Sequence, residues 1–82
     1  MQRYLVEAHC ALEADALARA VRLCAGETRQ IRSVFVPEDQ ICFHLIEAQS
    51  LEAATAAIAS AEIAHARIVE AIEWHNADGG QG

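Results

Sequence analysis

The sequence predicts an α+β fold of the ferredoxin-like kind, with four antiparallel strands and two helices in the order βαββαβ. Two observations predict it. Four segments alternate in side-chain character with a period of two, as strands do, and two Ala-rich segments carry apolar residues at helical spacing. In this order both helices are expected to cover the same face of one sheet.

The first part of the chain predicts a strand and a helix. Residues 3–9 (RYLVEAH) alternate between two sets of side chains, as a strand does. Residues 11–26 are rich in Ala, Leu and Arg, which favour helices, and Gly26 is a natural helix end. The expected apolar stripe of this helix consists of Leu17, Val21 and Cys24.

A β-hairpin is expected next. Residues 28–36 are rich in β-branched and aromatic side chains, which favour strands. Residues 37–40 (PEDQ) have the composition of a turn, and residues 41–48 (ICFHLIEA) follow as the partner strand. The segment 28–48 therefore predicts two antiparallel neighbours.

The second helix and the last strand complete the domain. Ser50 is suited to cap a helix over 51–62, and residues 66–74 alternate again as a strand. Residues 1–75 are therefore expected to form a single domain, and 76–82, which lack large apolar side chains, a flexible tail. The expected stripe of the second helix consists of Leu51, Ala54, Thr55 and Ile58.

Composition narrows the class of protein. The chain has 82 residues, of which 54% are apolar and 22% charged, as is typical of one globular domain. The net charge is −6 and the arginines are scattered, so no nucleic acid or anionic membrane is expected as a partner. No apolar run reaches the roughly 18 residues of a membrane span, and Glu7 interrupts a signal-like stretch, so a cytoplasmic location is expected.

One face of the sheet is expected to lack a covering helix, and we call it the uncovered face. The second strand fits either alternation, so its side chains remain unassigned. On the other strands the residues expected under the helices are Tyr4, Val6, Ala8, Phe43, Leu45, Val69 and Ala71. The residues expected on the uncovered face are Leu5, Glu7, His9, Cys42, His44, Ile46, Ile68, Glu70, Ile72 and Trp74.

A homodimer is expected from this assignment. Small monomeric proteins rarely leave a large apolar patch in water. A second copy could cover the patch back to back. The apolar residues that motivate this expectation are Leu5, Ile46, Ile68, Ile72 and Trp74.

The polar residues of the same face form the candidate site, and three functions remain open. A metal site would use Glu7, His44, His9 and Cys42, donors that suit Ni²⁺, Zn²⁺ or Cu²⁺. A small cofactor-free isomerase, cyclase or monooxygenase would use Glu7 or His44 for proton transfer beside Glu70, on a small apolar ligand. In a purely structural protein these groups would only fix the dimer register. His44 is preferred to Cys42 as the working residue, because imidazole titrates near neutral pH.

Three stretches resemble a family of small bacterial proteins, long classed as a domain of unknown function, that includes nickel-binding members. They are RYLVE at 3–7, PEDQICFHLIEAQSLEA at 37–53 and RIVEAIE at 67–73. The resemblance implies a ferredoxin-like fold, dimers of the α/β-barrel kind and nickel as a candidate metal, but it assigns no ligand residue. The chain departs from the family pattern at Gln49, where Pro is usual, and at 62–66, where a Gly-Leu-Pro-Phe-Asp-like segment is usual.

Overall fold

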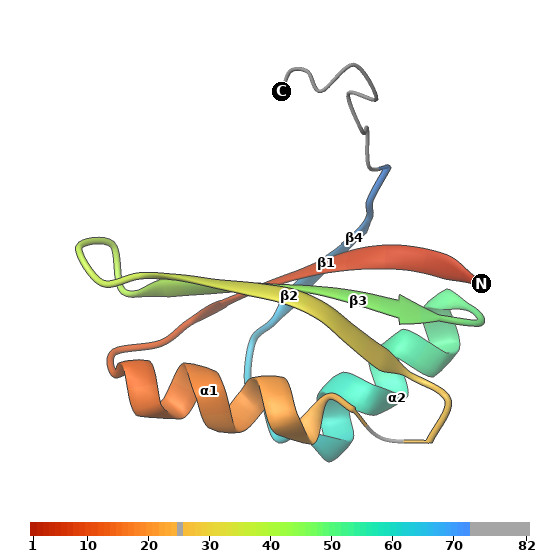
Figure 1. Ribbon diagram of the computed structural model, residues 1–82, viewed down its shortest axis with the longest axis horizontal. Helices are drawn as coiled ribbons and strands as arrows, with labels where there is room; N and C mark the ends of the chain where they lie inside the picture. Colours follow the sequence, from red (N-terminus) through yellow and green to blue (C-terminus); the bar gives the residue numbers. More distant parts are fainter. Residues whose placement is uncertain (25, 73–82) are drawn as a thin grey trace.

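The computed structural model describes residues 1–24 and 26–72, which form a four-stranded antiparallel sheet and two helices (Figure 1). The sheet order is β2-β3-β1-β4, which confirms the predicted ferredoxin-like βαββαβ fold. Trp74 and the expected tail at 76–82 lie outside the described residues. The elements are β1 (Gln2–His9), α1 (Glu13–Arg22), β2 (Arg29–Val36), β3 (Ile41–Ala48), α2 (Leu51–Ser60) and β4 (Arg67–Glu70).

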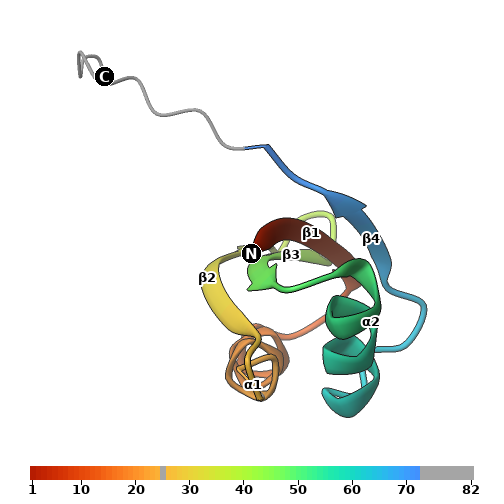
Figure 2. The same ribbon diagram turned by 90° about the vertical axis from the view of Figure 1, so that its right-hand side faces the viewer.

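Both helices lie side by side against one face of the sheet (Figure 2). No helix of the described residues lies on the opposite, uncovered face (Figures 1 and 2). The helix-covered side holds the main core, a cluster that joins β1, β3 and α2. It comprises Tyr4, Val6, Ala8, Leu23, Ile46, Ala48, Ala54, Ala57, Ile58, Ala61 and Ile63.

The hairpin turns where the sequence predicted. Residues 37–40 form the turn, closed by a hydrogen bond of 3.2 Å from the Gln40 backbone N–H to the Pro37 carbonyl oxygen. Gln40 adopts a positive φ of 55°, a left-handed conformation that ends a tight turn. The partner strands then run side by side from Val36 and Ile41.

The second helix begins at the predicted cap. The Ser50 hydroxyl accepts a hydrogen bond from the Ala53 backbone N–H at 3.1 Å, which satisfies a donor that the helix leaves unpaired. The predicted stripe is only partly right. Ala54 and Ile58 are buried, but Leu51 and Thr55 are exposed, and Ala57 is buried in addition.

The predicted stripe of α1 is wrong. Leu17 and Val21 are 62% and 73% exposed, and Cys24 is exposed as well. The buried positions are Ala16 and Leu23, which also recur at helical spacing but one residue earlier. The helix therefore presents a small side chain to the sheet and leaves larger apolar ones outside.

The predicted side-chain directions of β1 are confirmed, and those of β3 are wrong. Val6 lies opposite His44 in the antiparallel register, and directly opposite residues point to the same face. Cys42 and His44 therefore lie under the helices, where both are fully buried. Both alternate sets of β3 are apolar enough for a core, so hydrophobicity alone could not choose between them. Ile46 follows His44 into the core, and Phe43 and Leu45 lie on the uncovered face.

The predicted directions of β4 are also wrong. Ile68 lies opposite Val6 and packs against the core, whereas Val69 lies opposite Leu5 on the uncovered face. Glu70 lies opposite Tyr4, so it shares the side of the helices, although it is exposed. Short strands carry few alternations, and a single residue of slip reverses the assignment.

A membrane-spanning helix is not found among residues 1–24 and 26–72, because none of their helices has the necessary length and apolar character.

Candidate functional site

The proposed partnership of Glu7 with His44 does not form. Glu7 lies opposite Phe43 on the uncovered face, whereas His44 lies opposite Val6 on the other side of the sheet. The Glu7 carboxylate instead pairs with Arg67, with Oε1 and Nη1 3.3 Å apart. The two residues that carried both the metal and the proton-transfer hypotheses are thus separated by the sheet itself.

The remaining candidates are dispersed as well. His9 is exposed at the end of β1, where its Nε2 lies 3.3 Å from Oε1 of Gln40. Glu70 is exposed on the helix side of β4. Within the described ranges, 1–24 and 26–72, no group of three or more His, Cys, Asp or Glu side chains is arranged to hold a metal ion.

The structure does bring Cys42 and His44 together, but beneath the helix layer. Nδ1 of His44 lies 2.6 Å from the Ser33 hydroxyl oxygen, and Nε2 lies 3.4 Å from the Cys42 sulfur. The register explains both contacts, since Ser33 is directly opposite His44 and Cys42 is two residues away on the same strand. The imidazole is therefore held at both nitrogens.

Arg19 of α1 fixes the sulfur end of this chain of contacts. Its Nη1 donates to the backbone oxygen of His9 at 2.7 Å and lies 3.8 Å from the Cys42 sulfur. Cys42 also packs with Cys10 and Ala16 in a small buried cluster. The guanidinium thus lies at the boundary of the core, close to two groups that can titrate.

Burial and Arg19 set the protonation states of the pair. Burial lowers the pKa of His44, and the nearby Arg19 charge lowers it further, so the ring is neutral at neutral pH. Burial raises the pKa of the Cys42 thiol more than the hydrogen bond from Arg19 lowers it, so the thiol keeps its proton. A neutral imidazole can accept a proton from its other neighbour, Ser33.

Ser33 connects this buried pair to solvent. It is exposed, although its hydroxyl reaches the fully buried His44. Sequence reasoning missed it, because the alternation of β2 fitted either face. The available signal was the pairing of the hairpin strands: counting back from the Pro37–Gln40 turn would have placed Ser33 opposite His44.

A cavity of about 360 Å³ lies beside Ser33, between α1 and β2. Most of its lining is apolar, and the Ser33 hydroxyl and the Glu13 carboxylate are its polar side chains. A few polar groups in an apolar cavity are typical of small-molecule sites. The lining residues are Glu13, Ala16, Leu17, Ser33, Val34, Phe35 and Pro37.

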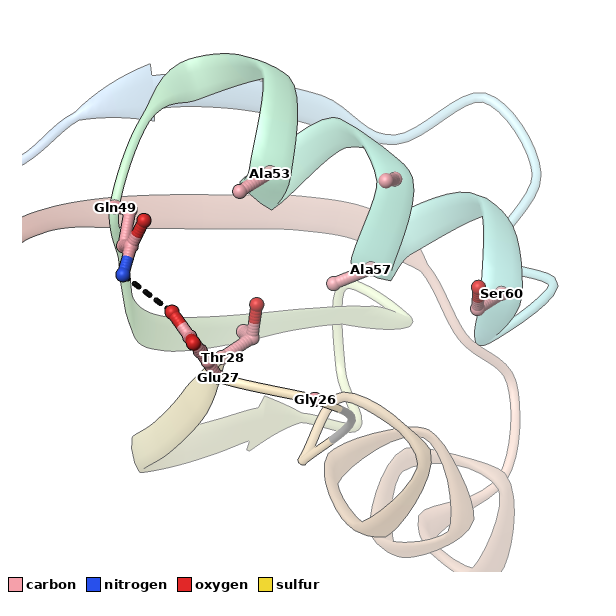
Figure 3. Close-up of a pocket in the computed structure, with 8 residues that line it drawn as sticks. Gly26, Glu27, Thr28, Gln49, Ala53, Ala57 and Ser60 are labelled. Carbon is pink, nitrogen blue, oxygen red and sulfur yellow. Dashed lines mark hydrogen bonds between the residues drawn. The ribbon is translucent and has the colours of Figure 1, made fainter.

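A second cavity, of about 350 Å³, lies between α2 and the segment that enters β2 (Figure 3). Ala53, Ala57 and Ser60 face it from the helix, and a hydrogen bond from Gln49 to Glu27 lies at one end (Figure 3). None of its lining side chains is both buried and titratable, so it offers space but little chemistry.

A third cavity, of about 350 Å³, brings two of the predicted site residues together. Glu7 and His9 line it with His65 and Arg67, at the end of β1. The Arg67 guanidinium already pairs with the Glu7 carboxylate there. A cation would therefore meet the carboxylates of Asp39 and Glu7, of which Glu7 is already paired with the positively charged Arg67.

The uncovered face has an apolar centre and a charged margin. Glu47 lies between Arg3 and Arg29, with N–O distances of 3.6 and 3.1 Å. The apolar side chains are half-buried except Val34, which is 49% exposed. By their pairing they are Leu5, Val34, Val36, Ile41, Phe43, Leu45 and Val69.

Comparisons with protein-family models, with curated proteins and with solved structures find no match to this chain.

Proposed function

We propose that this chain is a small-ligand-binding protein that works as a homodimer, with the ligand in the cavity between α1 and β2. One observation carries the choice of cavity: an exposed hydroxyl on its wall, that of Ser33, is hydrogen-bonded to a fully buried imidazole. Burying an imidazole is unfavourable unless it is hydrogen-bonded, and its contact with Ser33 leads toward solvent.

The lining indicates the chemistry of the ligand. Leu17, Phe35 and Pro37 offer apolar surface, and the Ser33 hydroxyl can donate or accept one hydrogen bond. The Glu13 carboxylate at the same cavity disfavours an anion. The best fit is a small neutral molecule with an apolar body and one carbonyl or hydroxyl group.

We propose the uncovered face as the interface of the homodimer, with the residues that the strand pairing assigns to this face. Phe43 and Leu45 replace Ile46 and Ile68 as its apolar centre. A second copy suits this surface because the margin carries both signs of charge, which a two-fold axis can pair across the interface. Nickel, or another transition metal, remains an expectation from the resemblance alone, and native mass spectrometry of untagged protein would report a bound metal together with the oligomer.

The ligand proposal is tested by amide NMR titration with small ketones, cyclohexanone and 2-butanone. We expect resonances of the cavity residues to shift, Ser33 and Phe35 most, and Ser33→Ala to weaken binding because the hydrogen-bond partner is lost. Ser60→Ala is the matched control, since Ser60 lines the other cavity. Shifts confined to the cavity of Ser60, or no shift at any concentration that the ketones allow, would contradict the proposal.

A further inference from the structure

We infer that Ser33 is a nucleophile with His44 as its base, and that the cavity takes a carboxylic ester or a comparable acyl compound. The inference rests on the proposed function, because it assigns a reaction to the same cavity. It adds three features: the Ser33–His44 contact, the support behind the imidazole, and a pair of backbone donors next to Ser33.

The first feature is the geometry of nucleophile and base. The Ser33 oxygen and His44 Nδ1 are 2.6 Å apart, within the distance needed for direct proton transfer. Ser33 is exposed at the cavity, so a carbonyl carbon can approach it, whereas His44 is fully buried and meets the substrate only through Ser33. A hydroxyl is a weak nucleophile, and an adjacent base is what activates it.

The second feature is the support of the imidazole. For Nδ1 to accept a proton, the neutral ring must carry its hydrogen on Nε2. Nε2 faces the Cys42 sulfur at 3.4 Å, and that sulfur can accept this hydrogen. Nη1 of Arg19 donates a hydrogen bond to the sulfur at 3.8 Å, and Arg19 is itself fixed by its hydrogen bond to the His9 backbone oxygen at 2.7 Å. Cys42 and Arg19 are thus positioning residues.

The third feature is a pair of backbone donors occupied by the chain's own amide. The pairing of β2 with β3 shifts between Gln30 and Arg32, which turns neighbouring N–H groups toward one point. The Gln30 side-chain amide finds partners for both its oxygen and its nitrogen in one orientation. In that orientation its oxygen accepts hydrogen bonds from the backbone N–H groups of Arg32 at 3.2 Å and Ser33 at 3.1 Å. The same oxygen accepts from the Ser33 hydroxyl at 2.9 Å, so the single hydroxyl hydrogen turns to Nδ1 of His44 once the Gln30 side chain leaves.

Gln30 therefore places a carbonyl oxygen where the carbonyl oxygen of a substrate would need to lie. Two backbone N–H groups beside a serine nucleophile are the donors that stabilise an oxyanion in acyl transfer. When the Gln30 side chain leaves, these donors are free for the substrate. Gln30 is only partly buried, so its displacement does not disturb the core.

The reaction balances with this chain's own groups. The Ser33 oxygen forms a bond to the acyl carbon, and its proton moves to Nδ1 of His44. The bond from the acyl carbon to the leaving alkoxide then breaks, and the alkoxide takes a proton from a water molecule in the cavity. The hydroxide left by that water adds to the acyl carbon, the bond to the Ser33 oxygen breaks, and the Ser33 oxygen takes its proton back from His44.

The test uses p-nitrophenyl butyrate and full-length protein in a Cys24→Ser background. Cys24 is an exposed free thiol that esters would also acylate, so it must be removed. We expect a butyryl adduct on the peptide that contains Ser33, and no adduct in Ser33→Ala. The Ser60→Ala variant, at the other cavity, should react as the background protein does.

Two further variants separate a base from a purely structural histidine. His44→Gln should slow acylation on the order of 10²-fold, the typical contribution of a general base. Gln30→Ala should instead speed acylation, because it clears the backbone donors, and a residue with only a structural role would not produce a gain. Since His44 is buried and its replacement can unfold the chain, Gln30→Ala and Ser33→Ala decide the outcome.

Each result has one meaning. An adduct that persists in Ser33→Ala, or acylation that Gln30→Ala leaves unchanged or slows, overturns the inference. Ketone binding at Ser33 without any adduct from the ester also overturns it, and leaves the proposed ligand site standing. If neither ketone nor ester engages Ser33, both the inference and the proposed function fail.

Discussion

His44 shows how one residue can be a core residue and a site residue at once. Its ring is fully buried, yet one nitrogen contacts the exposed Ser33 and the other contacts Cys42. A buried polar side chain with satisfied hydrogen bonds stabilises a particular arrangement of its neighbours, whereas an unpaired one is strongly unfavourable. The hydrogen bonds that offset the cost of burying His44 therefore also hold its ring beside the Ser33 hydroxyl.

The lowered pKa of His44 makes the free energy of unfolding depend on pH. A histidine in the unfolded chain titrates at about 6.5, and burial holds the folded value below that. Below about pH 6.5 the unfolded state binds more protons, so the stability that neutral His44 contributes is present above this pH and is lost as the pH falls. We expect urea midpoints to decrease from about pH 7.5 to about pH 5.5, and to decrease less in His44→Gln. Equal decreases in both proteins would contradict this.

The cysteines should differ in reactivity by their burial. Cys42 and Cys10 are buried, and burial raises the pKa of the Cys42 thiol, so little reactive thiolate forms. Cys24 is exposed and should react first with a maleimide in the native state. Peptide mapping after a short labelling time should find the label on Cys24. Early label on Cys42 in the folded protein would show that the helix layer opens readily.

At the scale of single residues, the sequence predicted part of the arrangement around His44. It singled out Cys42 and His44 as sharing a face, and the structure confirms that they do. It placed Glu7 with them, which is wrong, because the residue opposite His44 on β1 is Val6. It could not find Ser33 from chemistry alone, since a single serine in a strand has no distinctive pattern.

At the scale of elements, the two helices differ in how they begin. Ser50 caps α2 through its side chain, whereas Leu12, at the corresponding position before α1, makes no side-chain cap bond. Leu12 is 62% exposed, so replacing it removes little apolar burial. We expect Leu12→Ser to raise the free energy of unfolding by about 1 kcal/mol and Ser50→Ala to lower it by about the same amount. Urea unfolding measures both, and a destabilised Leu12→Ser would show that Leu12 has an unrecognised packing role.

The element order could be predicted far better than the faces. Alternation, helix-forming composition and turn residues are local signals, so all six elements appear in the expected order and places, although β4 ends at Glu70 and not at 74. The side that a strand turns to the core depends on its partners in the sheet. In β3, Cys42 and Ile46 on one side and Phe43 and Leu45 on the other are equally suited to a core. In α1 the close approach to the sheet favours Ala16 over Leu17, a choice that only packing makes.

At the scale of the whole molecule, charge is distributed unevenly over the sheet. The chain has a net charge of −6 and six basic residues. Four arginines, Arg3, Arg29, Arg32 and Arg67, lie on the uncovered face by their pairing. Glu7 pairs with Arg67, and Glu47 pairs with Arg3 and Arg29. A further positive charge at the centre of this face would therefore be unfavourable when two copies meet.

The proposed dimer is tested by a pair of arginine substitutions. Phe43→Arg puts a fifth arginine at the apolar centre of the uncovered face, and in a back-to-back dimer it would face the arginines of a second copy without water to screen them. Leu17→Arg adds the same side chain at a 62% exposed position of α1, on the opposite side of the sheet, and serves as the control. In sedimentation velocity we expect wild type and Leu17→Arg to be dimers at micromolar concentration and Phe43→Arg to be a folded monomer. Ile68→Arg would not make this distinction, because Ile68 packs against the core and its loss would unfold the chain. If the wild-type protein is a monomer, the proposed homodimer is wrong. If Phe43→Arg is still a dimer, the dimer interface lies on a surface other than the uncovered face.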